Sequence, residues 1–209
     1  MPIIDISRPL NPAIAVWPGD TPFQLTRNLS LAHGDSVNLT TLTLSAHTGS
    51  HADAPWHFSA DGPTMEQIDL AVYWGLAQVV TVSKEDGSLW PADFAAYDLT
   101  AAPRLLVRSP ASEQPATLFP THFVHPSPAL AEYLAGLGII LYGSDAPSMD
   151  AATSKILSGH QALWRHGIAI LESLNLAAAP DGLYELSALP LSIAGGDGSP
   201  VRAALRRRE

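Results

Sequence analysis

The chain has 209 residues, of which 46% are hydrophobic, and this supplies enough apolar material for one sizeable core. We therefore expect a single domain over residues 1–209. A formal net charge of -9 disfavours nucleic acid as a partner, because it would repel phosphate backbones. The chain has no cysteine for disulfides or thiolate ligands and no apolar run of membrane-spanning length, so we expect a cytoplasmic protein without a membrane partner.

Six segments have the composition of β-strands. Two of them, residues 23–30 and 36–45, indicate that the first third of the chain is β structure. The other four are short apolar runs at residues 76–82, 104–107, 138–142 and 167–171. Runs of this kind are typical of strands that are buried on both faces of a mixed or parallel sheet.

Two helices are predicted between the apolar runs. Ser127 followed by Pro128 is typical of an N-cap and a first helical position, so a helix is expected over residues 129–137, ending at Gly138. A second helix is expected over residues 153–165. The strands and helices together indicate an α/β fold in which helices flank a mixed sheet.

Residues 45–58 form the most informative segment, because they hold three of the eight histidines and an aspartate without any Lys, Arg or Glu. Neutral imidazole beside carboxylate is the ligand set that zinc, manganese and iron accept most readily. Burying these side chains without a cation would leave many polar atoms unpaired, whereas a divalent ion would satisfy them together. The segment therefore predicts a metal site that contains His47, His51, Asp53 and His57.

The spacing of these residues restricts the backbone. In a helix, Asp53 would point roughly 240° around from His47, and Gly49 and Pro55 would weaken the helix. In a straight strand, His47 and His51 would stand roughly 13 Å apart, which is too far for ligation of one ion. A turn at Gly49 would bring the two imidazoles together. We therefore expect the end of a strand followed by a tight loop.

Two later residues are candidates for a second metal position. His160 shares the apolar face of the second predicted helix with Ile156 and Leu163. Glu172 ends an apolar run, where an ionised carboxylate is costly without a partner. Alone, His160 would be interpreted as a packed core histidine and Glu172 as a strand end that faces solvent. Together they predict a second site in which Asp53 or Glu172 bridges the two ions.

A recognisable pattern is formed by HTGSHADAPWHF at residues 47–58, YGSDAPS at residues 142–148, and the segments 153–160 and 167–172. This pattern resembles the bacterial kynurenine formamidases of the cyclase-like metal-dependent hydrolase family, and the likeness runs over essentially the whole chain. The resemblance implies a β/β/α fold, usually a homodimer. It also implies that the small-molecule substrate is N-formyl-L-kynurenine, which is hydrolysed to L-kynurenine and formate in tryptophan degradation.

The resemblance further implies a site with two zinc ions per subunit, and manganese or another divalent ion is compatible with the same donors. According to this resemblance, the first zinc would be bound by His47, His51 and Asp53. The second would be bound by Asp53, His160 and Glu172, and Glu172 would reach both ions. His57 would be the proton donor and acceptor. Trp17 matches the family's aromatic residue that contacts the substrate. The chain departs from the family at Gln161, where members often carry a second histidine, and this change would alter the surroundings of the ligands.

Two other functions are compatible with these motifs. A sister hydrolase with the same first motif, such as a manganese-dependent isatin hydrolase, would use a single ion and would not need His160. A non-catalytic metal-binding module would keep the fold but has no need of His57. The glycine-rich residues 195–198 lack both a lysine and a following helix, so we interpret them as a turn rather than a phosphate-binding loop.

Overall fold

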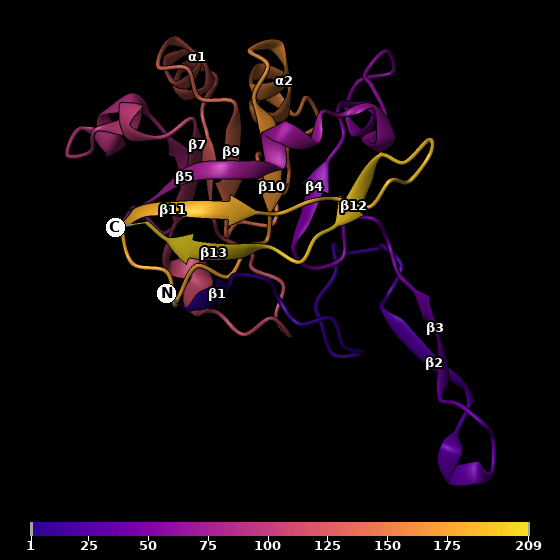
Figure 1. Ribbon diagram of the computed structural model, residues 1–209. Helices are drawn as coiled ribbons and strands as arrows, with labels where there is room; N and C mark the ends of the chain where they lie inside the picture. Colours follow the sequence, from indigo (N-terminus) through magenta and orange to yellow (C-terminus); the bar gives the residue numbers. More distant parts are fainter. Residues whose placement is uncertain (1, 209) are drawn as a thin grey trace.

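The computed structural model describes residues 2–208 and has an α/β fold built on one large, curled mixed sheet (Figure 1). Its nine strands follow the order β1-β13-β11-β5-β7-β9-β10-β4-β12. In chain order they are β1 (Ile3–Asp5), β4 (His51–Asp53), β5 (Trp74–Thr81), β7 (Arg104–Arg108), β9 (Leu141–Ser144), β10 (Ala169–Glu172), β11 (Gly182–Ser187), β12 (Gly198–Pro200) and β13 (Ala204–Arg207).

The centre of the sheet is parallel and the two sides are antiparallel. The parallel strands β5, β7, β9 and β10 correspond to the four apolar runs of the sequence, so the prediction of buried strands in a mixed sheet is confirmed. Alternate side chains of β7 face opposite sides of the sheet. Leu105 and Val107 pack into one apolar core, and Leu106 packs into the other. Both faces of the centre are therefore covered.

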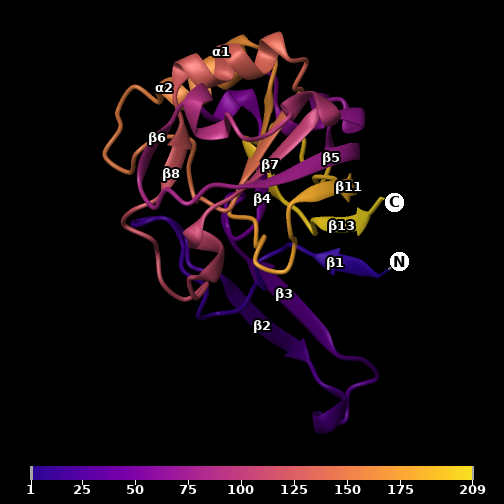
Figure 2. The same cartoon turned by 90° about the vertical axis from the view of Figure 1, so that its left-hand side faces the viewer.

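The two α-helices, α1 (Pro128–Gly136) and α2 (Ser158–Arg165), lie side by side over one face of the sheet (Figures 1 and 2). The first helix agrees with the prediction, and the Ser127 hydroxyl accepts a hydrogen bond from Leu130 N at 3.1 Å. Leu134 and Leu163 join the helices to the core on this face. Within residues 2–208, neither of the two α-helices is long and apolar enough to cross a membrane.

The second helix begins later than predicted, because residues 153–157 form turns instead of a first helical turn. The carboxylate that caps the helix is Asp150, which accepts hydrogen bonds from the backbone N–H groups of Gly159 at 2.8 Å and His160 at 3.0 Å. Ile156 therefore lies outside the helix and is 78% exposed. The prediction that Ile156 shares an inward face with His160 is wrong.

Two further pairs of strands stand outside the large sheet. The predicted strands of the first third are confirmed as β2 (Gln24–Leu29) and β3 (Leu39–Thr43), an antiparallel hairpin that projects away from the body as an arm (Figures 1 and 2). A small parallel sheet is formed by β6 (Gly87–Leu89) and β8 (Val124–Pro126). Short 3₁₀ helices occur at Leu31–His33, Pro55–His57, Met65–Gln67, Leu70–Tyr73, Pro91–Phe94, Leu99–Ala101 and Pro110–Glu113.

Candidate metal centre

Three histidines and two carboxylates meet where β4, β10 and α2 come together. The antiparallel pairing of β4 with β10 places His51 opposite Glu172, and Asp53 lies two residues further along β4 on the same face. His160 enters from α2, and His47 enters from the loop that precedes β4. The structure therefore brings together the two halves of the predicted site, which are more than a hundred residues apart in the chain.

The loop between His47 and His51 is the tight turn that the spacing requires. Gly49 has a left-handed backbone with φ 68°, and a Cβ atom there would lie 2.8 Å from Leu10 Cδ2. The Gly49 carbonyl accepts a hydrogen bond from His51 Nδ1 at 2.8 Å, which leaves His51 Nε2 to face the carboxylates. The prediction of a turn at Gly49 is confirmed.

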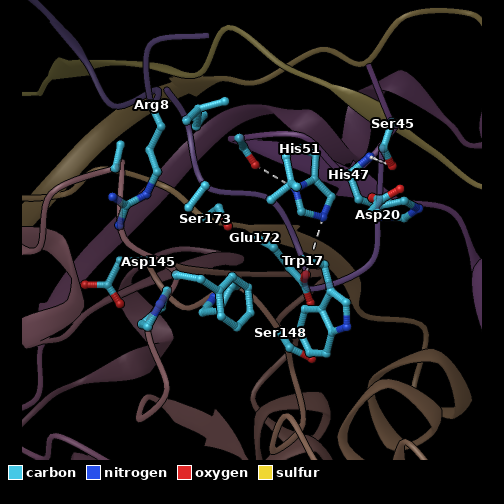
Figure 3. A pocket seen from close by; sticks show the side chains of 18 of the residues that line it. Arg8, Trp17, Asp20, Ser45, His47, His51, Asp145, Ser148, Glu172 and Ser173 are labelled. Carbon is cyan, nitrogen blue, oxygen red and sulfur yellow. Dashed lines mark hydrogen bonds and ion pairs between the residues drawn. The ribbon is translucent and has the colours of Figure 1, made fainter. Parts of the chain in front are cut away.

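Asp53 and Glu172 each reach two histidines or more. Asp53 Oδ1 lies 3.0 Å from His47 Nδ1 and 3.4 Å from His51 Nε2, and Asp53 Oδ2 lies 3.5 Å from His160 Nε2. Glu172 Oε2 lies 3.4 Å from His51 Nε2 (Figure 3). Glu172 Oε1 lies 3.2 Å from His160 Nε2. Nitrogen and oxygen donors therefore converge on one small volume from several directions.

Four side chains of this cluster are buried, and three of their donor atoms lack a hydrogen-bond partner. His51, Asp53, His160 and Glu172 are only 2–4% exposed. Among the described residues, His51 Nε2 and both Asp53 carboxylate oxygens have no hydrogen-bond partner. Unpaired buried groups of this kind are costly, and a divalent cation would satisfy them together. The residues present fit a divalent metal with nitrogen and oxygen ligands.

The same groups perturb one another electrostatically. Burial opposes a charge on His51, but the carboxylates of Asp53 and Glu172 outweigh it and raise the pKa of this imidazole to about 10. Burial also opposes ionisation of Asp53, yet its contacts with His160, His47 and His51 hold the pKa of its carboxyl well below the usual value. The cluster therefore favours a positive charge at its centre, and a bound divalent cation would supply that charge in place of protons.

Two polar contacts position His160 and the helix that carries it. Asp150 Oδ2 accepts a hydrogen bond from His160 Nδ1 at 2.7 Å, so that Nε2 faces the cluster. Gln161, the residue that departs from the family pattern, donates from Nε2 to the Phe58 carbonyl at 2.6 Å. Gln161 thus joins α2 to the segment that carries His57. The sequence reading did not identify Asp150, because this carboxylate lies well before the helix that it caps.

His57 stands at the exposed side of the cluster beside a carboxylate that the sequence reading missed. The ring centroids of His57 and His47 are 4.1 Å apart. Asp197 Oδ2 lies 3.2 Å from His47 Nε2 and 3.4 Å from His57 Nδ1. Asp197 belongs to the glycine-rich segment that was interpreted as a simple turn, and it reaches the site because the following strand, β12, pairs with β4. A single aspartate among glycines carries no local signal of this contact.

The cluster opens into a cavity of about 470 Å³, large enough for a one-ring ligand. His47, His51, His57 and His160 contribute to its lining. Trp17 is also part of the wall and packs edge-to-face on Phe119, with ring centroids 5.2 Å apart. Figure 3 shows Trp17 on the opposite side of the view from Arg8. The structure therefore places Trp17 in the cavity that the candidate metal ligands share.

Comparisons with known sequences agree with this arrangement. Residues 4–151 match a family model named Cyclase and described as putative cyclase. The chain is 44% identical to a kynurenine formamidase from Bacillus cereus and 43% identical to one from Bacillus cytotoxicus. Each match extends over 203 residues, which are 97% of this chain and 96% of the relative.

Solved structures show the same fold. A potential metal-dependent hydrolase with cyclase activity has a TM-score of 0.85 at 26% identity, covering 100% of this chain and 98% of that one. Isatin hydrolase A from Labrenzia aggregata has a TM-score of 0.84 at 24% identity, covering 100% of this chain and 94% of that one. This likeness concerns the fold alone. The predicted cyclase-like α/β fold is confirmed. The chain belongs to the Cyclase family and is a homologue of the bacterial kynurenine formamidases.

Proposed function

We propose that the chain is a metal-dependent arylformamidase that hydrolyses N-formyl-L-kynurenine to L-kynurenine and formate. The observation that carries this proposal is the convergence of buried, unpaired nitrogen and oxygen donors at a cavity with an aromatic wall. The substrate is taken from the relatives of the same length, which are kynurenine formamidases. The isatin hydrolases share the fold at lower identity, and this favours the formamide over the isatin ring.

Two metal positions are proposed, and the contacts within the cluster support them. The first has the donors His47, His51 and Asp53, and the second has Asp53, His160 and Glu172, with Glu172 also reaching the first. Zinc is the proposed ion, because imidazole and carboxylate without thiolate are the ligands of catalytic zinc sites. Two such ions would lower the pKa of a water molecule and polarise a carbonyl oxygen.

His57 is the proposed proton carrier. The contact of its Nδ1 atom with Asp197 leaves Nε2 available to the cavity that His57 lines. As the oxygen of water bonds to the formyl carbon, the C–N bond of the formamide breaks and the aniline nitrogen needs a proton. His57 would take a proton from the water and deliver it to this nitrogen. Asp197 would hold the ring of His57 in position through both steps.

Trp17 is proposed to contact the aromatic ring of the substrate. Its edge-to-face partner Phe119 restricts the indole, so that a flat surface is offered to a ligand in the cavity. A planar aryl formamide would lie along this surface with its formyl group toward the histidine cluster. Trp17→Ala is therefore expected to raise the KM for N-formylkynurenine more than it lowers kcat.

The test of the function is turnover of N-formylkynurenine by metal-stripped protein that is resupplied with zinc, with manganese or with nothing. We expect turnover with zinc, none without metal, and two bound ions per chain by elemental analysis. Failure to hydrolyse the formamide under all three conditions would refute the assignment. A single manganese per chain, with isatin as the better substrate, would favour the isatin hydrolase function instead.

We also propose that the protein is a homodimer in which the arm, β2 and β3, contacts the second copy. Every residue of both strands is exposed, including Leu25 at 48% and Leu42 at 53%. An isolated two-stranded hairpin is marginally stable in water, and exposed apolar side chains gathered on it favour a protein partner. Light scattering should give twice the monomer mass for the wild-type protein and the monomer mass for Leu25→Asp combined with Leu42→Asp. A monomeric wild-type protein would contradict the proposal.

A further inference from the structure

Arg8 brings a permanent positive charge to the cavity that holds the metal cluster. It follows β1 in the chain and is partly buried. Among the described residues that line the cavity, it is the single Lys or Arg. Figure 3 shows its side chain extending toward Asp145 on one side of the cavity, with Trp17 on the other side. A ligand that reaches from the histidine cluster across the cavity would therefore meet a cation.

The guanidinium group of Arg8 is only partly used by the protein. Its Nη2 atom donates to the Ala111 carbonyl at 3.1 Å, and its Nη1 atom donates to the Gln114 carbonyl at 3.4 Å. These bonds use two of the five N–H donors that a guanidinium carries. Within residues 2–208, no Asp or Glu carboxylate oxygen lies within 4.0 Å of an Arg8 side-chain nitrogen, so Arg8 forms no ion pair there. Arg8 thus retains both charge and donors for a ligand.

Asp145, the carboxylate whose charge acts on Arg8, is occupied by other groups. Its oxygens accept hydrogen bonds from the backbone N–H and the hydroxyl of Ser109 at 2.7 and 2.8 Å, and from those of Ser112 at 3.1 and 2.7 Å. Burial lowers the pKa of the Arg8 guanidinium, and the charge of Asp145 opposes this effect from a distance. Asp145 therefore supports the positive charge of Arg8 without pairing with it.

We propose that Arg8 binds the α-carboxylate of the substrate and thereby selects amino-acid formamides over formamides that lack a carboxylate. This inference rests on the proposed formamidase function. In N-formylkynurenine the formyl group and the carboxylate end two substituents on adjacent ring carbons and are separated by the keto side chain, and the histidine cluster and Arg8 are likewise at different parts of one cavity. The planar guanidinium is the side chain best suited to hold a carboxylate through two parallel hydrogen bonds.

The experiment compares two substrates in steady-state kinetics. One is N-formylkynurenine, and the other is ring-formylated kynuramine, which keeps the aryl formamide and the amine but lacks the carboxylate. The wild-type protein should have a KM at least about tenfold lower for the carboxylated substrate. Arg8→Gln should raise the KM for N-formylkynurenine by about tenfold or more and leave the KM for the kynuramine unchanged. Arg8→Lys should recover part of the difference, because it keeps the charge but not the planar fork.

Arg202→Gln is the matched control, since it removes an arginine that is 80% exposed and pairs with Asp5 outside the cavity. Neither KM should change in this variant. An equal loss on both substrates in Arg8→Gln, or no change on either, would overturn the inference. If that variant does not fold, the wild-type comparison decides, because equal KM values for the two substrates would also overturn it. A wild-type protein that hydrolyses neither formamide would instead refute the proposed function.

Discussion

Replacing Asp150 with alanine should weaken both the second helix and the metal site. Asp150 accepts hydrogen bonds from the backbone N–H groups of Gly159 at 2.8 Å and His160 at 3.0 Å, where α2 begins. It also accepts from His160 Nδ1 at 2.7 Å, and this contact directs Nε2 toward Asp53 and Glu172. One carboxylate therefore caps a helix and orients a proposed ligand.

The size of both effects follows from these contacts. Loss of an N-cap costs about 1 kcal/mol, and loss of a buried hydrogen bond to a charged group costs about 1.5–3 kcal/mol. The free energy of unfolding of the metal-free protein should therefore fall by about 2.5–4 kcal/mol in Asp150→Ala. Loss of the partner that orients a metal-binding histidine lowers metal affinity by about 10- to 100-fold.

Urea unfolding of the metal-free protein measures the first effect, and titration of zinc against a competing chelator measures the second. Ser127→Ala is the matched control, because it removes the N-cap of α1, where the Ser127 hydroxyl accepts from Leu130 N, without a contact to the cluster. This control should lose about 1 kcal/mol of stability and keep its zinc affinity. Wild-type zinc affinity in Asp150→Ala would refute the argument that Asp150 orients the ligand.

Four further outcomes are expected. His57→Ala should bind the same number of zinc ions, measured by elemental analysis, but lose turnover by about 100-fold or more, and full activity would remove His57 from the mechanism. Asp197→Asn should lower kcat by about 10- to 100-fold, because its contacts to the two neighbouring imidazoles weaken. Gly49→Ala should lower the melting temperature, since φ is 68° there and the new methyl group would meet Leu10. The raised pKa of His51 favours a protonated imidazole at neutral pH without metal, so binding of the proposed zinc ion to His51 should displace a proton. Calorimetry in buffers of different ionisation enthalpy should detect this release, and zinc affinity should rise with pH; a pH-independent affinity would contradict it.

The elements that could be predicted from the sequence carry their signals locally. The Ser127-Pro128 cap lies next to its helix, and the four apolar runs are buried strands whatever their order in the sheet. The turn at Gly49 was predicted because neither a helix nor a straight strand brings His47, His51 and Asp53 together. In each case the residues that determine the structure are within a few positions of one another.

The features that were missed depend on contacts between distant segments. The helical pattern extended back to residue 153, but the carboxylate that sets the start of α2 is Asp150, which reaches forward past several turn residues. Asp197 contacts His47 only because β12 pairs with β4. The short outer strands β1, β12 and β13 have no apolar run of their own, so pairing with neighbours defines them.

The three residues of β4 connect the metal site to the apolar core through one strand register. His51 and Asp53 share a face, and the pairing with β10 adds Glu172 to that face opposite His51. Ala52 and Leu171, which also lie opposite each other, face the other way and pack into the apolar core inside the curled sheet. A shift of one residue would move the donors into the core and the apolar side chains into the cavity. Burial of Ala52 and Leu171 therefore selects the same register that brings the metal donors together, so that packing of the core and assembly of the site favour one arrangement of the two strands.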